Sequence, residues 1–256
     1  MQNTSINGAS KIPQITLAFW IMKICATTLG ETGGDLVSMT LNVGYALSSI
    51  ILVALFLVAL TAQLRSRKFR PVLYWTVILA TSTAGTTMSD FMDRTLQLGY
   101  ARGSALLVAL LVSVLIIWRL SEGSLSVDRI VSRKGELFYW IAILFSNTLG
   151  TALGDYLADS SGLGFLGGAI LISSLLALVA VGHWFTKISP VLLFWIAFIL
   201  TRPFGATFGD FLTKPSTRGG LGLGTIGSSA VLFGLLAILV GYSIKSKNAV
   251  VPGPSA

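Results

Sequence analysis

The chain has 256 residues and a mean hydropathy of +0.81, and only 11% of its residues are charged. Soluble domains carry about 25% charged residues, so the composition excludes an ordinary soluble fold and indicates an integral membrane protein. The net charge is +8, but most Lys and Arg residues lie in short loops between apolar stretches. This placement is typical of topology signals and of contacts with the lipid bilayer, and it argues against nucleic-acid binding.

Eight apolar stretches predict eight transmembrane helices, because about 20 apolar residues cover the roughly 30 Å hydrocarbon core of a bilayer. In chain order they span residues 14–38, 44–64, 70–93, 100–119, 136–159, 164–185, 189–213 and 222–243. The expected fold is therefore an all-α integral membrane protein, with one membrane domain over residues 1–256. A single cysteine and a single histidine exclude a disulfide framework and argue against a Cys/His zinc site.

One sequence pattern occurs four times along the chain. It reads G-x-x-x-[GS]-D and stands at residues 30–35, 85–90, 150–155 and 205–210. A Trp lies 15 residues before each motif Asp and a Gly nine residues after it, and the aspartates are 55, 65 and 55 residues apart. These spacings predict four two-helix repeats, approximately at 14–68, 69–133, 134–187 and 188–247.

Each predicted repeat crosses the membrane twice, so all four repeats are expected to be parallel, in a pseudo-fourfold or a two-plus-two arrangement. The loops that follow the even-numbered spans carry Arg65, Arg67, Lys68, Arg70, Arg119, Arg129, Arg133, Lys134, Lys187, Lys245 and Lys247. The opposite loops carry Arg94, Arg102, Lys214 and Arg218. This bias predicts that both termini are cytoplasmic and that the motif aspartates lie in the outer half of the membrane.

Most of the acidic residues belong to the repeated motif. Of ten acidic residues, seven lie there: Glu31, Asp35, Asp90, Asp93, Asp155, Asp159 and Asp210. A carboxylate inside a span is costly, and it usually faces a cavity or a partner. Four equivalent aspartates on parallel repeats are expected to converge on one axis, a geometry that resembles the acidic ring of a cation pathway.

Polar residues precede each motif Asp on the same predicted helix face, because positions four, seven and eight residues earlier lie close to it. This polar stripe consists of Thr28, Thr83, Thr86, Thr148, Thr151 and Asn147. Oxygen ligands without Cys or His favour Mg²⁺, Mn²⁺, Ca²⁺, Na⁺ or H⁺. The sequence therefore predicts a path for an inorganic cation that could bind a divalent metal, and it indicates no other cofactor.

Two cationic residues, Lys23 and Arg202, lie within predicted spans. We expect them to pair with the acidic residues and to take the place of a proton during transport, which argues against a permanently open pore. The leading hypothesis is a transporter that exports Mn²⁺, Ca²⁺ or Mg²⁺ in exchange for protons, along a path lined by the four motif aspartates.

Two other functions remain open. The G-x-x-x-[GS] pairs place small residues one turn apart, which lets helices approach closely, and the aspartates could pair with Arg94, Arg102, Lys214 or Arg218. The protein would then be a structural or partner-binding membrane protein, for example in a homo-oligomer. Paired aspartates can also perform acid–base chemistry in an intramembrane enzyme, but no motif here has the G-x-G-D sequence of intramembrane aspartyl proteases. We expect no enzymatic activity.

The four G-x-x-x-[GS]-D motifs resemble those of a bacterial family of multi-pass proteins usually described as uncharacterised membrane-anchored proteins. This resemblance covers nearly the whole chain and implies the bacterial plasma (inner) membrane. The segment from Glu31 to Asp35 also looks like the E-x-G-D motif of small cation/proton exchangers that move calcium or manganese. It has one additional Gly, and the other three repeats lack the Glu.

Overall fold

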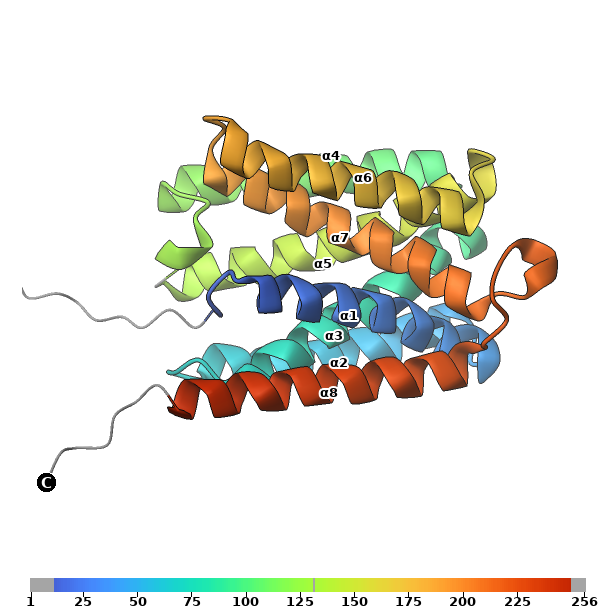
Figure 1. Cartoon of the computed structure of the whole chain (residues 1–256), viewed down its shortest axis with the longest axis horizontal. Coiled ribbons are helices and arrows are strands. Elements are labelled where there is room, and N and C mark those ends of the chain that lie inside the picture. The colour runs from blue at the N-terminus through green and yellow to red at the C-terminus, as the bar shows by residue number, and fades with distance from the viewer. Residues whose placement is uncertain (1–11, 131, 250–256) are drawn as a thin grey trace, which may run out of the picture.

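The computed structural model describes residues 12–130 and 132–249, and in these residues it contains helices and no strands (Figure 1). The long helices are α1 (Leu17–Asp35), α2 (Tyr45–Arg65), α3 (Pro71–Asp90), α4 (Tyr100–Glu122), α5 (Arg133–Asp155), α6 (Gly164–Phe185), α7 (Pro190–Thr213) and α8 (Thr225–Ala249). The prediction of an all-α fold is confirmed. The terminal residues, whose side of the membrane was predicted, lie outside the described part of the chain.

Three short π-helical turns directly follow motif aspartates. They are η1 (Leu36–Thr40), η2 (Phe91–Thr95) and η4 (Tyr156–Ser160), and 3₁₀ turns occur at η3 (Val127–Arg129) and η5 (Ser216–Arg218). The Gly that follows each motif Asp by nine residues has a positive φ angle, from 66° to 82°. Residues with a Cβ rarely adopt this conformation, so backbone geometry explains why glycine recurs there.

Six of the eight long helices are long and apolar enough to cross a bilayer: α2, α4, α5, α6, α7 and α8. The even-numbered members of this group expose most of their apolar surface, since only 22–28% of the most apolar 18-residue segment of each helix is buried. In α5 and α7 the buried share is 67% and 50%. The even-numbered helices thus present an apolar outer surface suited to a lipid bilayer, and the odd-numbered helices supply the interior.

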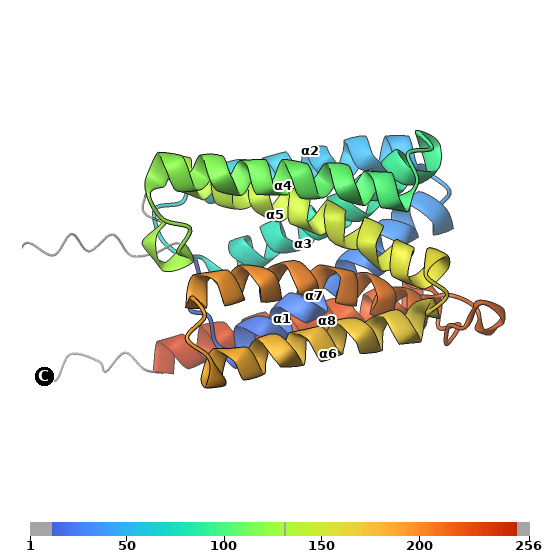
Figure 2. The ribbon, with the colours of Figure 1, turned by 90° about the horizontal axis from the view of Figure 1, so that it is seen from above.

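The four odd-numbered helices contact one another in a closed cycle. Helix α1 packs against α3 and α7, and α5 packs against the same two helices. Each even-numbered helix packs against the next odd-numbered one, α2 on α3, α4 on α5 and α6 on α7, and α8 completes the series by packing on α1. Figures 1 and 2 show the helices running along the long axis of the molecule, with the described ends of α1 and α8 at the same end.

Aromatic side chains fill the interior at the N-terminal ends of the odd-numbered helices. The hydroxyl groups of Tyr74 and Tyr139 form a 2.6 Å hydrogen bond, and Trp140 packs against Tyr74 with ring centroids 5.5 Å apart. Of the four repeated Trp residues, Trp75, Trp140 and Trp195 are buried and Trp20 is half-buried. The repeated Trp is therefore a packing residue at this end of the helix ring.

Candidate functional site

Residues four apart lie on the same face of a helix, and four such layers are buried inside the ring of odd-numbered helices. The aspartate layer contains Asp35, Asp90, Asp155 and Asp210. The second layer lies one turn toward the N-terminal ends and contains Glu31, Thr86, Thr151 and Ala206. The third layer contains Thr27, Ser82, Asn147 and Arg202, and the fourth contains Lys23, Ile78, Ile143 and Phe198. All sixteen residues are at most 4% exposed, so the interior changes from acidic through polar to apolar.

The glycines of the motif hold the helices of the ring close together. A Cβ added to the first Gly of each motif would collide with the next odd-numbered helix in the cycle: Gly30 with Ser82, Gly85 with Thr148, Gly150 with Arg202 and Gly205 with Thr27. The last Gly repeats the pattern, since an added Cβ would lie 2.7 Å from Thr86 at Gly34 and 2.7 Å from Ala206 at Gly154. Close helix packing therefore accounts for these glycines.

We expect the substitution Gly85→Ala to lower the free energy of unfolding by about 1–3 kcal/mol, because overpacking forces backbone shifts. The added Cβ would lie 2.9 Å from the backbone nitrogen of Thr148. The matched control is Gly234→Ala in α8, where an added Cβ meets nothing within 4 Å. Unfolding in detergent would measure both variants, and equal stability of the two would contradict the packing role.

Lys214 joins the aspartates of the first and fourth repeats. Its Nζ forms a short ion pair with Oδ2 of Asp35 and a 3.1 Å ion pair with Oδ1 of Asp210. Lys214 directly follows α7 and is largely buried. Burial disfavours its ammonium form, but the carboxylates of Asp210 and Asp35 outweigh this effect and raise the pKa of Lys214 above its ordinary value. The ammonium group thus bridges two carboxylates as a tethered cation.

Arg94 joins the aspartates of the second and third repeats in the same way. Its Nε lies 2.8 Å from Oδ1 of Asp90, and its Nη2 lies 3.1 Å from Oδ2 of Asp155. Arg94 and Lys214 each stand four residues after the Asp of their own repeat, and each reaches the Asp of the next repeat in the cycle. The four motif aspartates are therefore divided into two pairs.

Glu31 and Arg202 form an ion pair one turn from the aspartates. Arg202 is completely buried, and its Nη2 lies 2.9 Å from Oε2 of Glu31 and 2.6 Å from the hydroxyl oxygens of Thr86 and Thr151. Both hydroxyls are also within hydrogen-bond distance of Glu31, at 3.3 and 3.4 Å. The side chains from all four repeats thus meet at this level, since Ala206 belongs to the same layer as Glu31.

Glu31 and the four motif aspartates interact electrostatically, and we call them the carboxylate cluster. The charge of Asp90 acts on those of Asp155, Asp35 and Glu31, and the charge of Asp210 acts on the same three residues. Their cationic partners are Arg94, Arg202 and Lys214. The cluster therefore contains five carboxyl groups and three cationic side chains.

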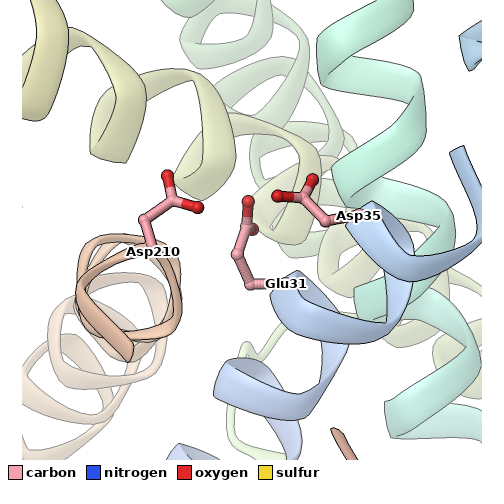
Figure 3. Close-up of side chains that lie close together, drawn as sticks. All are labelled: Glu31, Asp35 and Asp210. Carbon is pink, nitrogen blue, oxygen red and sulfur yellow. The ribbon is translucent and has the colours of Figure 1, made fainter. Parts of the chain in front are cut away.

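Three carboxyl groups of this cluster are close enough to hold a single metal ion. One oxygen from each of Glu31, Asp35 and Asp210 lies within 4.8 Å of the others, and all three residues are buried. Figure 3 shows Glu31 and Asp35 on α1 and Asp210 on α7, with their carboxyl groups turned toward one another. We call these three residues the acidic trio. Lys214 forms ion pairs with two of its members.

Lys23 lies apart from the cluster. It is fully buried, its Nζ has no hydrogen-bond partner in the described residues, and that atom lies 3.9 Å from the centre of the Phe198 ring. We expected Lys23 to pair with an acidic residue, as Arg202 does. Lys23 forms no such pair in the described residues, because it stands two turns from Glu31 in a layer whose other residues are apolar.

The two additional motif acids, Asp93 and Asp159, point away from the ring. Asp93 accepts a hydrogen bond from Ser89 and packs against Gly103 of α4. Asp159 is about one third exposed and contacts Tyr100 and Arg218. The doubled carboxylates of repeats two and three therefore do not join the carboxylate cluster.

The predicted polar stripe is divided by depth. Thr86 and Thr151 face Glu31 and Arg202, and Asn147 donates a 2.9 Å hydrogen bond to Thr81. The other three, Thr28, Thr83 and Thr148, donate their hydroxyl hydrogens to carbonyl oxygens of their own helices. These last groups are satisfied locally, which is common for threonine inside a helix.

From the sequence, Arg94 and Lys214 are expected only as structural partners of the motif aspartates, together with Arg102 and Arg218. Arg102 is exposed, and Arg218 contacts Asp159 at 3.5 Å. The signal that separates the two bridging residues from the other two is their position four residues after a motif Asp, since such pairs lie side by side on a helix.

Comparison with known families identifies the repeat itself. One family model, described as Repeat of Unknown Function (DUF347), matches the chain four times, at residues 18–69, 73–124, 138–189 and 193–249. Each match covers one two-helix unit, so the prediction of four repeats and the resemblance to a four-repeat family are confirmed. No curated protein and no solved structure matches the chain.

Proposed function

The chain belongs to the DUF347 repeat family, and we propose that it is a membrane transporter that exports a hard divalent cation in exchange for protons. The proposed cargo is Mn²⁺, Ca²⁺ or Mg²⁺, and no enzymatic step is part of the mechanism. All eight long helices would cross a bacterial plasma membrane with both termini in the cytoplasm. The odd-numbered helices would form a pseudo-fourfold inner ring.

The charge balance of the carboxylate cluster carries this proposal. Five buried carboxyl groups meet three cationic side chains, two of which are shared between two aspartates, so the cluster carries an excess of two negative charges when all these groups are ionised. Uncompensated charge is costly in a low-dielectric interior. One divalent cation, or two protons bound within the ring, would compensate the two charges, which is the stoichiometry of an electroneutral exchange.

The acidic trio supports a divalent cation as the cargo. Three carboxylates with no Cys or His nearby form an oxygen-only ligand set, as hard cations prefer. Lys214 bridges Asp35 and Asp210, the position that a metal bound to both residues would take. Metal binding to these two carboxylates would then displace the ammonium group of Lys214.

The ion pair between Glu31 and Arg202 supports a carrier over an open pore. The pair joins the two layers that follow the aspartate layer and also contacts Thr86 and Thr151. A cation that moves along the axis would have to separate it. Transport would then proceed through alternating conformations and at low turnover.

One set of observations favours a second candidate, a structural or partner-binding membrane protein. The motif glycines are explained by helix packing, and each carboxylate of the cluster has a cationic partner. In that case the motif would maintain the ring and carry no cargo. Substitution of the aspartates would then reduce stability in detergent, and no ion flux would depend on them.

Purified protein in liposomes would test the transport proposal with a panel of Mn²⁺, Ca²⁺, Mg²⁺, Na⁺ and K⁺ under imposed pH gradients. With two protons exchanged per divalent cation, one pH unit should drive an accumulation of about 100-fold, since each proton contributes about 1.4 kcal/mol per pH unit. Protein-free liposomes are the control. The proposal fails when correctly inserted protein moves no cation of the panel.

A further inference from the structure

The ring contains a buried amine, that of Lys23, which lies outside the carboxylate cluster and has no hydrogen-bond partner among the described residues. Lys23 is 0% exposed, and its Nζ has no hydrogen-bond acceptor in the described part of the chain. Its layer contains Ile78, Ile143 and Phe198, all of them also completely buried. An ammonium group here would have the Phe198 ring, 3.9 Å from Nζ, as a cation–π contact, but its three N–H donors would lack a hydrogen-bond acceptor. A neutral amine pays a much smaller desolvation penalty.

Arg202 adds a second reason for a neutral amine. It stands one layer closer to the aspartates and acts electrostatically on Lys23. Within residues 12–130 and 132–249, no other charge acts on Lys23 as strongly, because Glu31 is two turns away and is already paired with Arg202. A proton on Lys23 would place two positive charges in adjacent layers of the same low-dielectric interior.

The other helices of the ring and α8 place few other ionisable groups near Lys23. Helices α3 and α5 contribute Tyr74 and Tyr139, one turn toward the N-terminal end and hydrogen-bonded to each other. Helix α7 contributes Arg202, and α8 has no ionisable side chain before Tyr242. On α1 itself, Cys25 donates a hydrogen bond to the carbonyl oxygen of Leu232. Lys23 is therefore the group here that can change its charge without breaking an existing hydrogen bond.

A cavity lies at the side of the bundle, at the depth of Lys23. It has a volume of about 610 Å³ and lies between α1, α6, α7 and the loop before α5. Its lining includes Ile24 and Ala197, the chain neighbours of Lys23 and Phe198. The cavity therefore reaches the depth of the layer that contains the amine.

We infer that Lys23 is a proton-binding site distinct from the carboxylate cluster and that it carries one of the protons exchanged for the cation. This inference rests on the proposed transport function. The amine nitrogen accepts the proton on its lone pair. The new charge repels Arg202 and favours its pairing with Glu31, so a proton on Lys23 and a metal on the acidic trio oppose each other, as exchange requires.

The substitution Lys23→Met tests this inference, because methionine keeps the length of the side chain and cannot bind a proton. With the membrane potential clamped at zero, the accumulation driven by one pH unit should fall from about 100-fold to about 10-fold, since one proton fewer contributes. Exchange of labelled for unlabelled cation at equal pH should stay within about twofold of wild type, because it requires no net proton movement. The control is Lys187→Met at an exposed loop position.

A second variant and a second measurement keep the test decisive. Lys23→Ile introduces the residue found at the same position in repeats two and three and should reproduce the result. Proton release on addition of Mn²⁺ to the purified protein should also decrease in both variants. Wild-type accumulation in Lys23→Met, or loss of folding in both variants, overturns the inference alone. Absence of any cation flux in wild type overturns the proposed function and the inference with it.

Discussion

Replacing Asp210 with Asn should reduce proton-driven cation uptake at least about 30-fold, while the protein still inserts and accumulates. Asp210 belongs to the acidic trio and to the ion pair with Lys214. Loss of one buried charged partner costs about 2–5 kcal/mol of binding, and 1.4 kcal/mol corresponds to a tenfold change in affinity. Uptake into proteoliposomes at matched protein content would measure the effect, and Asp35→Asn should behave alike.

The matched control for this prediction is Asp159→Asn. Asp159 is an acidic residue of the same motif region, but it lies outside the ring, is about one third exposed and pairs only loosely with Arg218 at 3.5 Å. Exposed pairs of this kind contribute about 0–1 kcal/mol, so uptake should remain within a few-fold of wild type. Normal flux in Asp210→Asn, or equal loss in both variants, would refute a cation site at the acidic trio.

The largest loss of stability is expected for Arg202→Met. Arg202 is completely buried, and it is the cationic partner of Glu31 and a hydrogen-bond partner of Thr86 and Thr151. Its removal leaves an unpaired buried carboxylate, which typically costs about 3–5 kcal/mol. The free energy of unfolding in detergent would measure this change.

A double variant distinguishes loss of the ion pair from loss of packing. In Glu31→Gln combined with Arg202→Met, no charge remains at this level, so the double variant should be more stable than Arg202→Met alone. The two substitutions should deviate from additivity by about 0.5–3 kcal/mol, the range of coupling between residues in contact. Strictly additive effects of the two substitutions would show that the ion pair contributes little.

Much of the fold follows from the sequence because local signals are strong in a membrane protein. The predicted spans 44–64 and 189–213 agree closely with α2 (Tyr45–Arg65) and α7 (Pro190–Thr213). Hydrophobic length marks the span, and Gly44 and Pro190 mark the start of each helix. The π-helical turns after three of the motif aspartates were not predicted, because they continue the helix without any change in composition.

The candidate site was predicted less completely, and the errors share one cause. The layer positions of Glu31, Asp35 and Arg202 follow from helical spacing. The bridging roles of Arg94 and Lys214 do not, because each reaches an Asp on another repeat. The isolation of Lys23 was missed for the same reason, since the residues around it come from α3, α5 and α7.

By itself, the sequence determined that this is a helical membrane protein with four repeats and that the motif aspartates occupy equivalent positions. These properties depend on hydrophobic length, helical period and internal spacing, all of which are local along the chain. Only the tertiary structure decided how the aspartates are paired and which buried basic side chain has no hydrogen-bond partner among the described residues. Those contacts join helices far apart in the sequence, so they depend on which repeat follows which around the ring and on how closely the motif glycines let the helices approach.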